Sequence, residues 1–392
     1  MKRWTLTMTL LSGLLALASC RRDTPPAGPE AAVGEPIRIG ALFAETGPAS
    51  FLGAPAARTA RMLTEQINAE GGLLGRPVEL VLRDTGGSPE RAVSFARQLI
   101  EEERVVAIIG PSTSGETMQI KDICQAAHMP LISCAAAEVI VNPVASYVFK
   151  TPQKDSQAAA WIFKTMNEMN ISRIGVVSGN TGFGNAGKAQ LEALAPEFGI
   201  EIAASEIYDS RATDLTDILT KVRGQNVQAV VNWSIVPAQA IVARNMRQLG
   251  MDVPLFQSHG YGNIKYVEQG GEAAEGTLFP GGRLLIVDTL PDDHPQKAPL
   301  AAYKKAYEER FNEEVSTFGG HAYDAFMIVA EAIRKAGSTE RSAVRDAIES
   351  LQGFVGTGGI FNFSPEDHNG LDMDAFEMLT VRNGRFEKYS KP

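Results

Sequence analysis

Three hydroxyl side chains, Ser112, Thr113 and Ser114, follow a short apolar run at 105–109 and a Gly-Pro turn. The run predicts a strand buried on both faces, and Glu116 begins a pattern with helical spacing. A serine or threonine before a helix is a typical N-cap, and the backbone N–H groups of a helix start bind anions. We therefore expect this loop to hold a ligand's carboxylate. An ordinary capped turn between a strand and a helix is the alternative.

Catalytic and metal-binding patterns find little support. The hydroxyl loop lacks the second glycine of a Gly-x-Ser-x-Gly nucleophile elbow, and no paired carboxylates stand out. The five histidines show no zinc-ligand spacing: His128, His259, His294, His321 and His368. We expect no enzyme, no metal site and no cofactor. An exported hydrolase remains as the catalytic alternative.

The stretch Gly182-Phe-Gly-Asn-Ala-Gly187 spells a dinucleotide-binding fingerprint and, with Lys188, most of a P-loop. The stretch Gly179-Asn-Thr181 stands between the preceding strand and the first glycine, and Ala189 stands where a P-loop needs a hydroxyl for magnesium. We expect these glycines to let Phe183 move over a cleft rather than to bind a nucleotide.

Composition indicates a globular protein with enough core for two domains. The 392 residues are 44% hydrophobic and carry a formal net charge of −9. An acidic chain without a basic stripe argues against a nucleic-acid partner.

The N-terminal residues indicate export. A positive start is followed by the apolar run 6–17 and by Leu17-Ala-Ser-Cys20, which together predict a signal peptide over residues 1–20. The cleavage region resembles a bacterial lipobox, which implies cleavage before Cys20, lipidation of that residue and a membrane-anchored location in the periplasm or cell envelope. A plain secretory signal is the alternative. Residues 21–35 contain three prolines and predict a flexible tether.

Strands and helices alternate along the rest of the chain. Strands are expected at 37–43, 78–82, 105–109, 130–133, 174–177, 200–207, 227–231 and 254–257. Such alternation predicts an α/β protein with two doubly wound parallel sheets, whose ligands bind outside the carboxyl ends of the strands. Cys124 and Cys134 are expected to be buried free thiols, because a helix of about ten residues separates them by about 15 Å.

Several stretches together resemble the periplasmic binding proteins of branched-chain amino acid ABC transporters (leucine-binding protein-like, type I fold). They are Ile37-Arg-Ile-Gly-Ala41, Thr46-Gly-Pro48, Ile67-Asn-Ala-Glu-Gly-Gly-Leu-Leu-Gly-Arg76, Ile109-Gly-Pro-Ser112, Pro130-Leu-Ile-Ser133, Ala274-Glu-Gly276 and Tyr323-Asp-Ala325. The resemblance implies two lobes joined by a three-strand hinge. Lobe one comprises 36–151 plus 283–355, and lobe two comprises 152–282 plus 356–392.

The resemblance also implies a ligand site on lobe one. Ser114, next to Thr113, and the backbone of the loop Ala135-Ala136-Ala137 match the positions that hold the ligand's carboxylate and amine. Ala137 stands where the family usually has threonine, so one hydroxyl is missing.

Further positions match the side walls of the family's site. Phe183 and Phe318 match pocket aromatics, and Leu52 matches an aromatic near the mouth. Ile235, beside Trp233, replaces a tyrosine near the ligand's ammonium, and Tyr261 lies nearby in sequence.

His259 replaces the acidic residue that grips the ammonium in the family. A buried ammonium without an anionic partner is costly, so the site should suit a carboxylate without an α-ammonium, and an aromatic or keto acid is plausible. His259 could donate a hydrogen bond or carry charge near neutral pH. In the alternative, His259 lies at the rim and Glu138 or Asp209 holds the ammonium of an amino acid.

The resemblance implies an extracytoplasmic solute-binding lipoprotein that delivers its ligand to the permease and ATPase subunits of an ABC importer. We expect a monomer. A ligand sensor of the same fold is the alternative.

Overall fold

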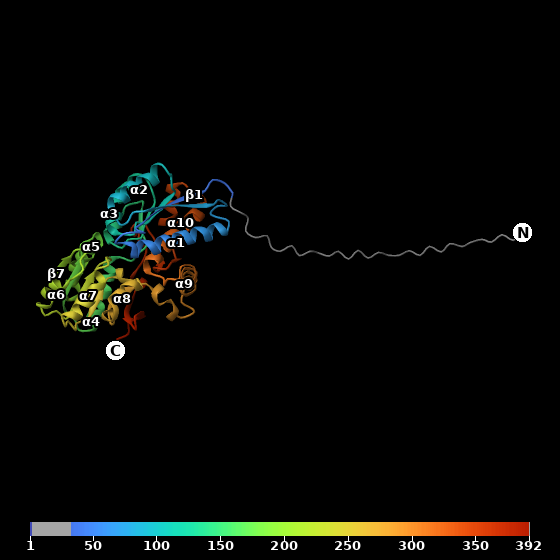
Figure 1. Cartoon of the computed structure of the whole chain (residues 1–392). Coiled ribbons are helices and arrows are strands. Elements are labelled where there is room, and N and C mark those ends of the chain that lie inside the picture. The colour runs from blue at the N-terminus through green and yellow to red at the C-terminus, as the bar shows by residue number, and fades with distance from the viewer. Residues whose placement is uncertain (2–32, 392) are drawn as a thin grey trace.

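The computed structural model describes Met1 and residues 33–391. The predicted signal peptide, Cys20 and most of the tether therefore lie outside the described residues. Figure 1 shows two α/β lobes side by side. Within residues 33–391, no helix is both long and apolar enough to cross a membrane.

The first lobe is built on a parallel five-stranded sheet in the order β2-β1-β3-β4-β5. Its strands are β1 (Ile37–Phe43), β2 (Val78–Asp84), β3 (Ala107–Ile109), β4 (Leu131–Ser133) and β5 (Val148–Lys150). One face is covered by α1 (Ser50–Ala69), α10 (Thr317–Ala336) and α11 (Arg341–Glu349). The other face is covered by α2 (Pro89–Glu101) and α3 (Ser114–Ala126). The sheet is thus buried on both sides, as apolar β-branched runs require.

The second lobe contains a seven-stranded sheet in the order β14-β13-β10-β9-β8-β6-β7. Its strands are β6 (Arg173–Gly179), β7 (Glu201–Tyr208), β8 (Ala229–Trp233), β9 (Leu255–Gln257), β10 (Leu278–Gly281), β13 (Glu377–Arg382) and β14 (Arg385–Lys388). The pairs β10–β13 and β13–β14 are antiparallel, whereas the other pairs are parallel. Helices α4 (Asp155–Glu168), α5 (Gly182–Leu194) and α8 (Ile264–Gly270) cover one face, and α6 (Thr216–Arg223) and α7 (Gln239–Gln248) cover the other.

The chain passes between the lobes three times: after β5, after β10 and before β13. Helix α9 (Lys297–Phe311) packs against α1 and α10 of the first lobe, and β11 (Phe354–Val355) pairs with β12 (Ile360–Phe361).

The third crossing lies later than the predicted boundary at 356. Phe361, Phe363 and Leu371 bury their side chains in the core of the first lobe, as does Ala375, whereas Phe376 belongs to the core of the second. The assignment of 356–375 to lobe two is therefore wrong, because the apolar side chains of this segment pack against the first lobe. Cys124 and Cys134 are free and buried, as predicted.

Candidate functional site

The starts of α3 and α5 meet across the cleft between the lobes. Thr113 is the N-cap of α3, and Thr181 is the N-cap of α5. A Cβ added to Gly182 would lie 2.9 Å from the backbone nitrogen of Gly115, so the helix starts are in contact. The lobes therefore adopt a closed arrangement.

The predicted cap at the start of α3 is confirmed, and it brings a carboxylate of its own. Thr113 Oγ1 accepts a hydrogen bond from Glu116 N at 3.3 Å, and Glu116 Oε2 accepts from Thr113 N at 3.2 Å. Burial raises the pKa of Glu116, and hydrogen bonds from Thr113 and Thr85 oppose that shift. The side chain of Glu116 thus occupies part of the positive helix end that we expected a ligand to use.

The loop after β4 is attached to the start of α3. Ser114 Oγ accepts a hydrogen bond from the backbone N–H of Ala137 at 3.2 Å. Ser133 Oγ accepts from Ala135 N at 3.1 Å and shares a 2.8 Å hydrogen bond with Thr117 Oγ1. The backbone of 135–137 is therefore held in one orientation beside Ser114.

Lys150 also holds the loop 135–137 in place. Its buried ammonium donates hydrogen bonds to the carbonyl oxygens of Ala136, Pro152 and Gln153 at 2.6, 3.0 and 3.0 Å. Burial lowers the pKa of Lys150 to about 8, and the carboxylate of Asp155 opposes that shift. The lysine joins the ligand-side loop to the first crossing between the lobes.

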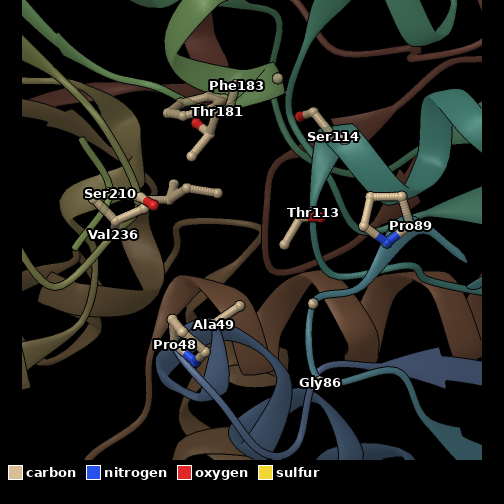
Figure 2. A pocket seen from close by; sticks show the side chains of 14 residues that line it. Pro48, Ala49, Gly86, Pro89, Thr113, Ser114, Thr181, Phe183, Ser210 and Val236 are labelled. Carbon is tan, nitrogen blue, oxygen red and sulfur yellow. The ribbon is translucent and has the colours of Figure 1, made fainter. Parts of the chain in front are cut away.

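Two adjoining cavities lie between the lobes. The outer cavity has a volume of about 280 Å³ and is shown in Figure 2. It is lined by Pro48, Ala49, Gly86, Gly87, Pro89, Thr113, Ser114, Gly115, Thr181, Gly182, Phe183, Ser210, Ile235 and Val236. The inner chamber has a volume of about 20 Å³ and is lined by Leu52, Ser112, Ser114, Cys134, Ala135, Ala136, Pro152, Phe183, Ile235, His259, Gly260, Phe318 and His321.

Most of the predicted site residues line these cavities. Those at the inner chamber are Leu52, Ser114, Ala135, Ala136, Phe183, Ile235, His259 and Phe318. Thr113 lines the outer cavity. Ser112 of the predicted hydroxyl loop also lines the chamber, and so does His321, whose position three residues after Phe318 already placed it near the cleft. Pro152 was missed by sequence reasoning.

Three predicted residues lie behind the cavity walls. Ala137 is fully buried and donates its N–H to Ser114. Trp233 is also fully buried, and its ring centroid lies 5.8 Å from that of Phe183. Tyr261 packs against Tyr266 with centroids 5.8 Å apart. These residues support the wall rather than form its surface.

His259 is buried and neutral. Burial lowers its pKa well below the usual value, and the charges of Lys150 and His321 add to that shift. The expectation that His259 carries charge near neutral pH is therefore wrong for the ligand-free protein, and so is the alternative that it lies at the rim. Its nearest carboxylate is Asp155, with 3.6 Å between Nε2 and Oδ1.

The two acids considered for holding an ammonium have other contacts. Glu138 Oε2 accepts a hydrogen bond from Ser156 N at 3.2 Å, and Asp209 is exposed and contacts Arg211. Neither acid is among the residues lining the two cavities.

The glycine motif of α5 is explained by close packing. A Cβ at Gly187 would overlap the indole of Trp233, and one at Gly182 would press on the start of α3. These glycines allow α5 to approach its neighbours closely, which agrees with a packing role and not with phosphate binding.

The family described as periplasmic binding protein matches residues 36–384. The chain belongs to this family. The predicted fold class is thereby confirmed, as is the expectation of a binding protein instead of an enzyme.

Individual relatives agree with the family assignment. The chain is 24% identical over 379 residues to a leucine-, isoleucine-, valine-, threonine- and alanine-binding protein of Pseudomonas aeruginosa, covering 96% of this chain and 97% of the relative. It is 24% identical to the Leu/Ile/Val-binding protein BraC3 of Rhizobium johnstonii, covering 86% of each chain.

Solved structures show the same fold. An extracellular ligand-binding receptor from Rhodopseudomonas palustris HaA2 superposes with a TM-score of 0.85 at 27% identity, covering 91% of this chain and 100% of the receptor. The branched-chain amino acid transporter substrate-binding protein LivJ from Streptococcus pneumoniae, in complex with isoleucine, superposes with a TM-score of 0.80 at 26% identity, covering 90% and 98%.

Proposed function

We propose that this periplasmic binding protein captures a small carboxylate between its lobes and delivers it to the permease of an ABC importer. The observation that carries the proposal is a cavity with one wall from each lobe, in which Ser114 of α3 faces the same space as Phe183 of α5. One relative is named as a binding protein for amino acids, and one solved structure is named as the substrate-binding protein of a branched-chain amino acid transporter. Both names support a small carboxylate as the ligand.

The ligand we propose has a carboxylate and no α-ammonium. His259 stands where the family's acidic residue is expected, and no carboxylate is among the lining residues of either cavity in residues 33–391. The ammonium of an amino acid would therefore lose its hydration without gaining an anionic partner among the lining residues. Burying such an unpaired charge costs on the order of several kcal/mol. The rings of Phe183 and Phe318 favour an aromatic acid, through edge and face contacts.

Capture follows from the two-lobed architecture. In an open form, the carboxylate binds lobe one at Ser114 and at the backbone of Ala135 and Ala136. Lobe two then closes with Phe183 and His259, and ligand contacts with both lobes stabilise the closed state. A lipid on Cys20 would keep the monomeric protein in the cell envelope, beside the permease and its ATPase.

A thermal-shift comparison tests the ligand class. Benzoate and phenylpyruvate should raise the melting temperature of the purified protein more than leucine and valine do, because binding to the native state alone stabilises it. Strong stabilisation by leucine or valine, with both aromatic acids inert, would overturn the proposed ligand class and leave an amino acid as the ligand. Inertness of all four compounds would count against a small carboxylate altogether.

A further inference from the structure

Two histidine side chains face the inner chamber without hydrogen-bond partners. Within the described residues, His259 Nδ1, His259 Nε2 and His321 Nδ1 are buried nitrogens with no partner. Both residues are buried, with 6% of His259 and 7% of His321 exposed. Burying an unpaired polar atom costs about 1–3 kcal/mol, so these atoms are expected to find partners when the chamber is filled.

The two imidazoles come from different lobes. His259 follows β9 in lobe two, at the start of a short 3₁₀ turn over His259–Tyr261, whereas His321 lies in the first turns of α10 in lobe one. His321 is held there by its backbone carbonyl, which accepts a hydrogen bond from Thr151 Oγ1 at 3.0 Å. A group bound between the two rings would therefore contact both lobes at once.

The charged groups around the pair are few, and one of their atoms, Asp155 Oδ1, has no hydrogen-bond partner in the described part of the chain. Lys150, whose charge acts on both rings, donates to three backbone carbonyls. Asp155 Oδ1 lies 3.6 Å from His259 Nε2, and Asp155 Oδ2 accepts a hydrogen bond from Glu138 N at 3.3 Å. The carboxyl of Glu138 acts on Lys150 and Asp155.

The remaining neighbours of the pair add no charge. Phe183, Trp233 and Phe376 present their rings edge to face against His259. The thiol of Cys134 lines the same chamber, and burial raises its pKa to about 12, so it is neutral at physiological pH.

The inner chamber is small and shares part of its lining with the outer cavity. A cavity needs a volume of roughly 10–15 Å³ to hold one water molecule. The inner volume of about 20 Å³ therefore holds about one water-sized group in this closed arrangement, and the outer cavity of about 280 Å³ can hold the body of a small ligand. Ser114, Phe183 and Ile235 line both spaces, so one molecule can occupy them together.

We propose that His259 and His321 form a receptor for the ligand's anionic head group and that the pair takes up one proton when a carboxylate enters the chamber. The inference rests on the proposed function and adds two specificity-determining residues to it, one from each lobe. The proton leaves hydronium in the solvent and forms an N–H bond at an imidazole nitrogen, and the ligand itself is not chemically changed.

The imidazoles take up a proton because the bound carboxylate gives them an anionic partner. In the ligand-free chamber, burial and Lys150 hold the pKa of both imidazoles below the usual value, to about 3 for His321. A carboxylate within a few ångströms favours the protonated ring and raises that pKa. The charged pair is then buried together, which costs far less than burying the carboxylate alone. An ammonium head group would meet the positive charge of Lys150 and would not favour protonation of either imidazole, so the pair disfavours an ammonium at this place.

The sign of the pH dependence follows from proton linkage. The ring has a low pKa without ligand and a higher pKa with ligand, so binding takes up a proton between these two values. In that interval the affinity falls as the pH rises, by about tenfold in Kd per pH unit for one proton.

Calorimetric titration with benzoate tests the proposal. At pH 5.5, 6.5 and 7.5, Kd should rise with pH, and measurements at pH 6.5 in two buffers of different ionisation enthalpy should report uptake of close to one proton. His259→Gln and His321→Gln retain an amide that can hydrogen-bond but cannot titrate, so each should reduce the proton count and flatten the pH profile. His128→Asn removes an exposed histidine at a positive φ that asparagine tolerates, and it should leave both readouts unchanged.

The outcomes separate this inference from the function on which it rests. Benzoate binding with a pH-independent Kd and no proton uptake would overturn the histidine receptor while leaving the carboxylate-binding function intact. The binding enthalpy of the wild-type protein in the two buffers reports proton uptake by itself, so the test does not require a glutamine variant to fold. Absence of binding by benzoate and phenylpyruvate at every pH would overturn the ligand class, and the receptor with it.

Discussion

Asn263 and Phe51 join the two lobes at the mouth of the site. The side-chain amide of Asn263, at the start of α8, donates a hydrogen bond of 2.9 Å to the backbone carbonyl oxygen of Phe51 in α1. Asn263 Oδ1 also accepts from Lys265 N at 3.0 Å and caps α8. The residue therefore has a local role through its oxygen and an interlobe role through its nitrogen.

Asn263→Asp should open the ligand-free protein and weaken binding. Aspartate keeps the cap but has no N–H for the carbonyl of Phe51, so the closed form loses about 0.5–1.5 kcal/mol. Benzoate should bind roughly threefold to tenfold more weakly, and small-angle scattering should show a larger radius of gyration without ligand. Glu268→Gln, an exposed change on the same helix, is the control. An unchanged radius and Kd would show that this contact does not influence closure.

Ser114→Ala should weaken ligand binding without unfolding the protein. The change removes the acceptor for Ala137 N–H and a hydroxyl at the junction of the two cavities. Losing the proposed hydrogen bond from this hydroxyl to the bound carboxylate costs about 1.5–3 kcal/mol, so benzoate affinity should fall by about tenfold or more. Calorimetry measures this loss, and Ser205→Ala, an exposed serine on β7, should bind normally. Wild-type affinity in Ser114→Ala would remove this residue from the proposed site.

Gly187→Ala should disturb the wall that carries Phe183. The added methyl would overlap the indole of Trp233, so α5 or Trp233 has to move. Overpacking of this kind typically costs about 1–3 kcal/mol. The melting temperature and benzoate affinity should both fall, whereas Gly224→Ala, where a Cβ makes contacts no closer than 3.4 Å, should have little effect. Equal stability of the two variants would contradict the close packing described for α5.

Asp155 should make the protein less stable as the pH rises from about 4 to about 7. Burial raises the pKa of this carboxyl from 3.8 to about 7, against the opposing charge of Lys150. The folded state therefore binds more protons than the unfolded state in this interval, and its advantage is lost as the pH rises. In Asp155→Asn, the free energy of unfolding should fall less between these two pH values, by on the order of 1–3 kcal/mol. Urea denaturation at each pH measures this difference.

Asp292→Asn is the matched control for this measurement because Asp292 is exposed. A steep decline that persists in Asp155→Asn would assign the pH dependence to other groups.

Local patterns predicted most of the strands and helices but missed β5 and β10. The β-branched run at 105–109 and the hydroxyl loop correctly indicated β3 and the capped start of α3, because apolar periodicity and capping act over a few residues. β10, with its proline, and the three-residue β5 have too little pattern of their own, and their pairing partners define them. The late third crossing was missed because the apolar residues of 356–375 suit either lobe.

The sequence by itself determined the alternation of strands and helices, the division into two lobes and the family to which the chain belongs. These features arise from local periodicity and from motifs read in order along the chain. Only the tertiary structure decided which side chains share the inner chamber, because Leu52, His259 and His321 are brought together by packing between distant segments. It also decided that His259 is neutral, since the charge of an imidazole depends on its burial and on Lys150, which no sequence pattern reports.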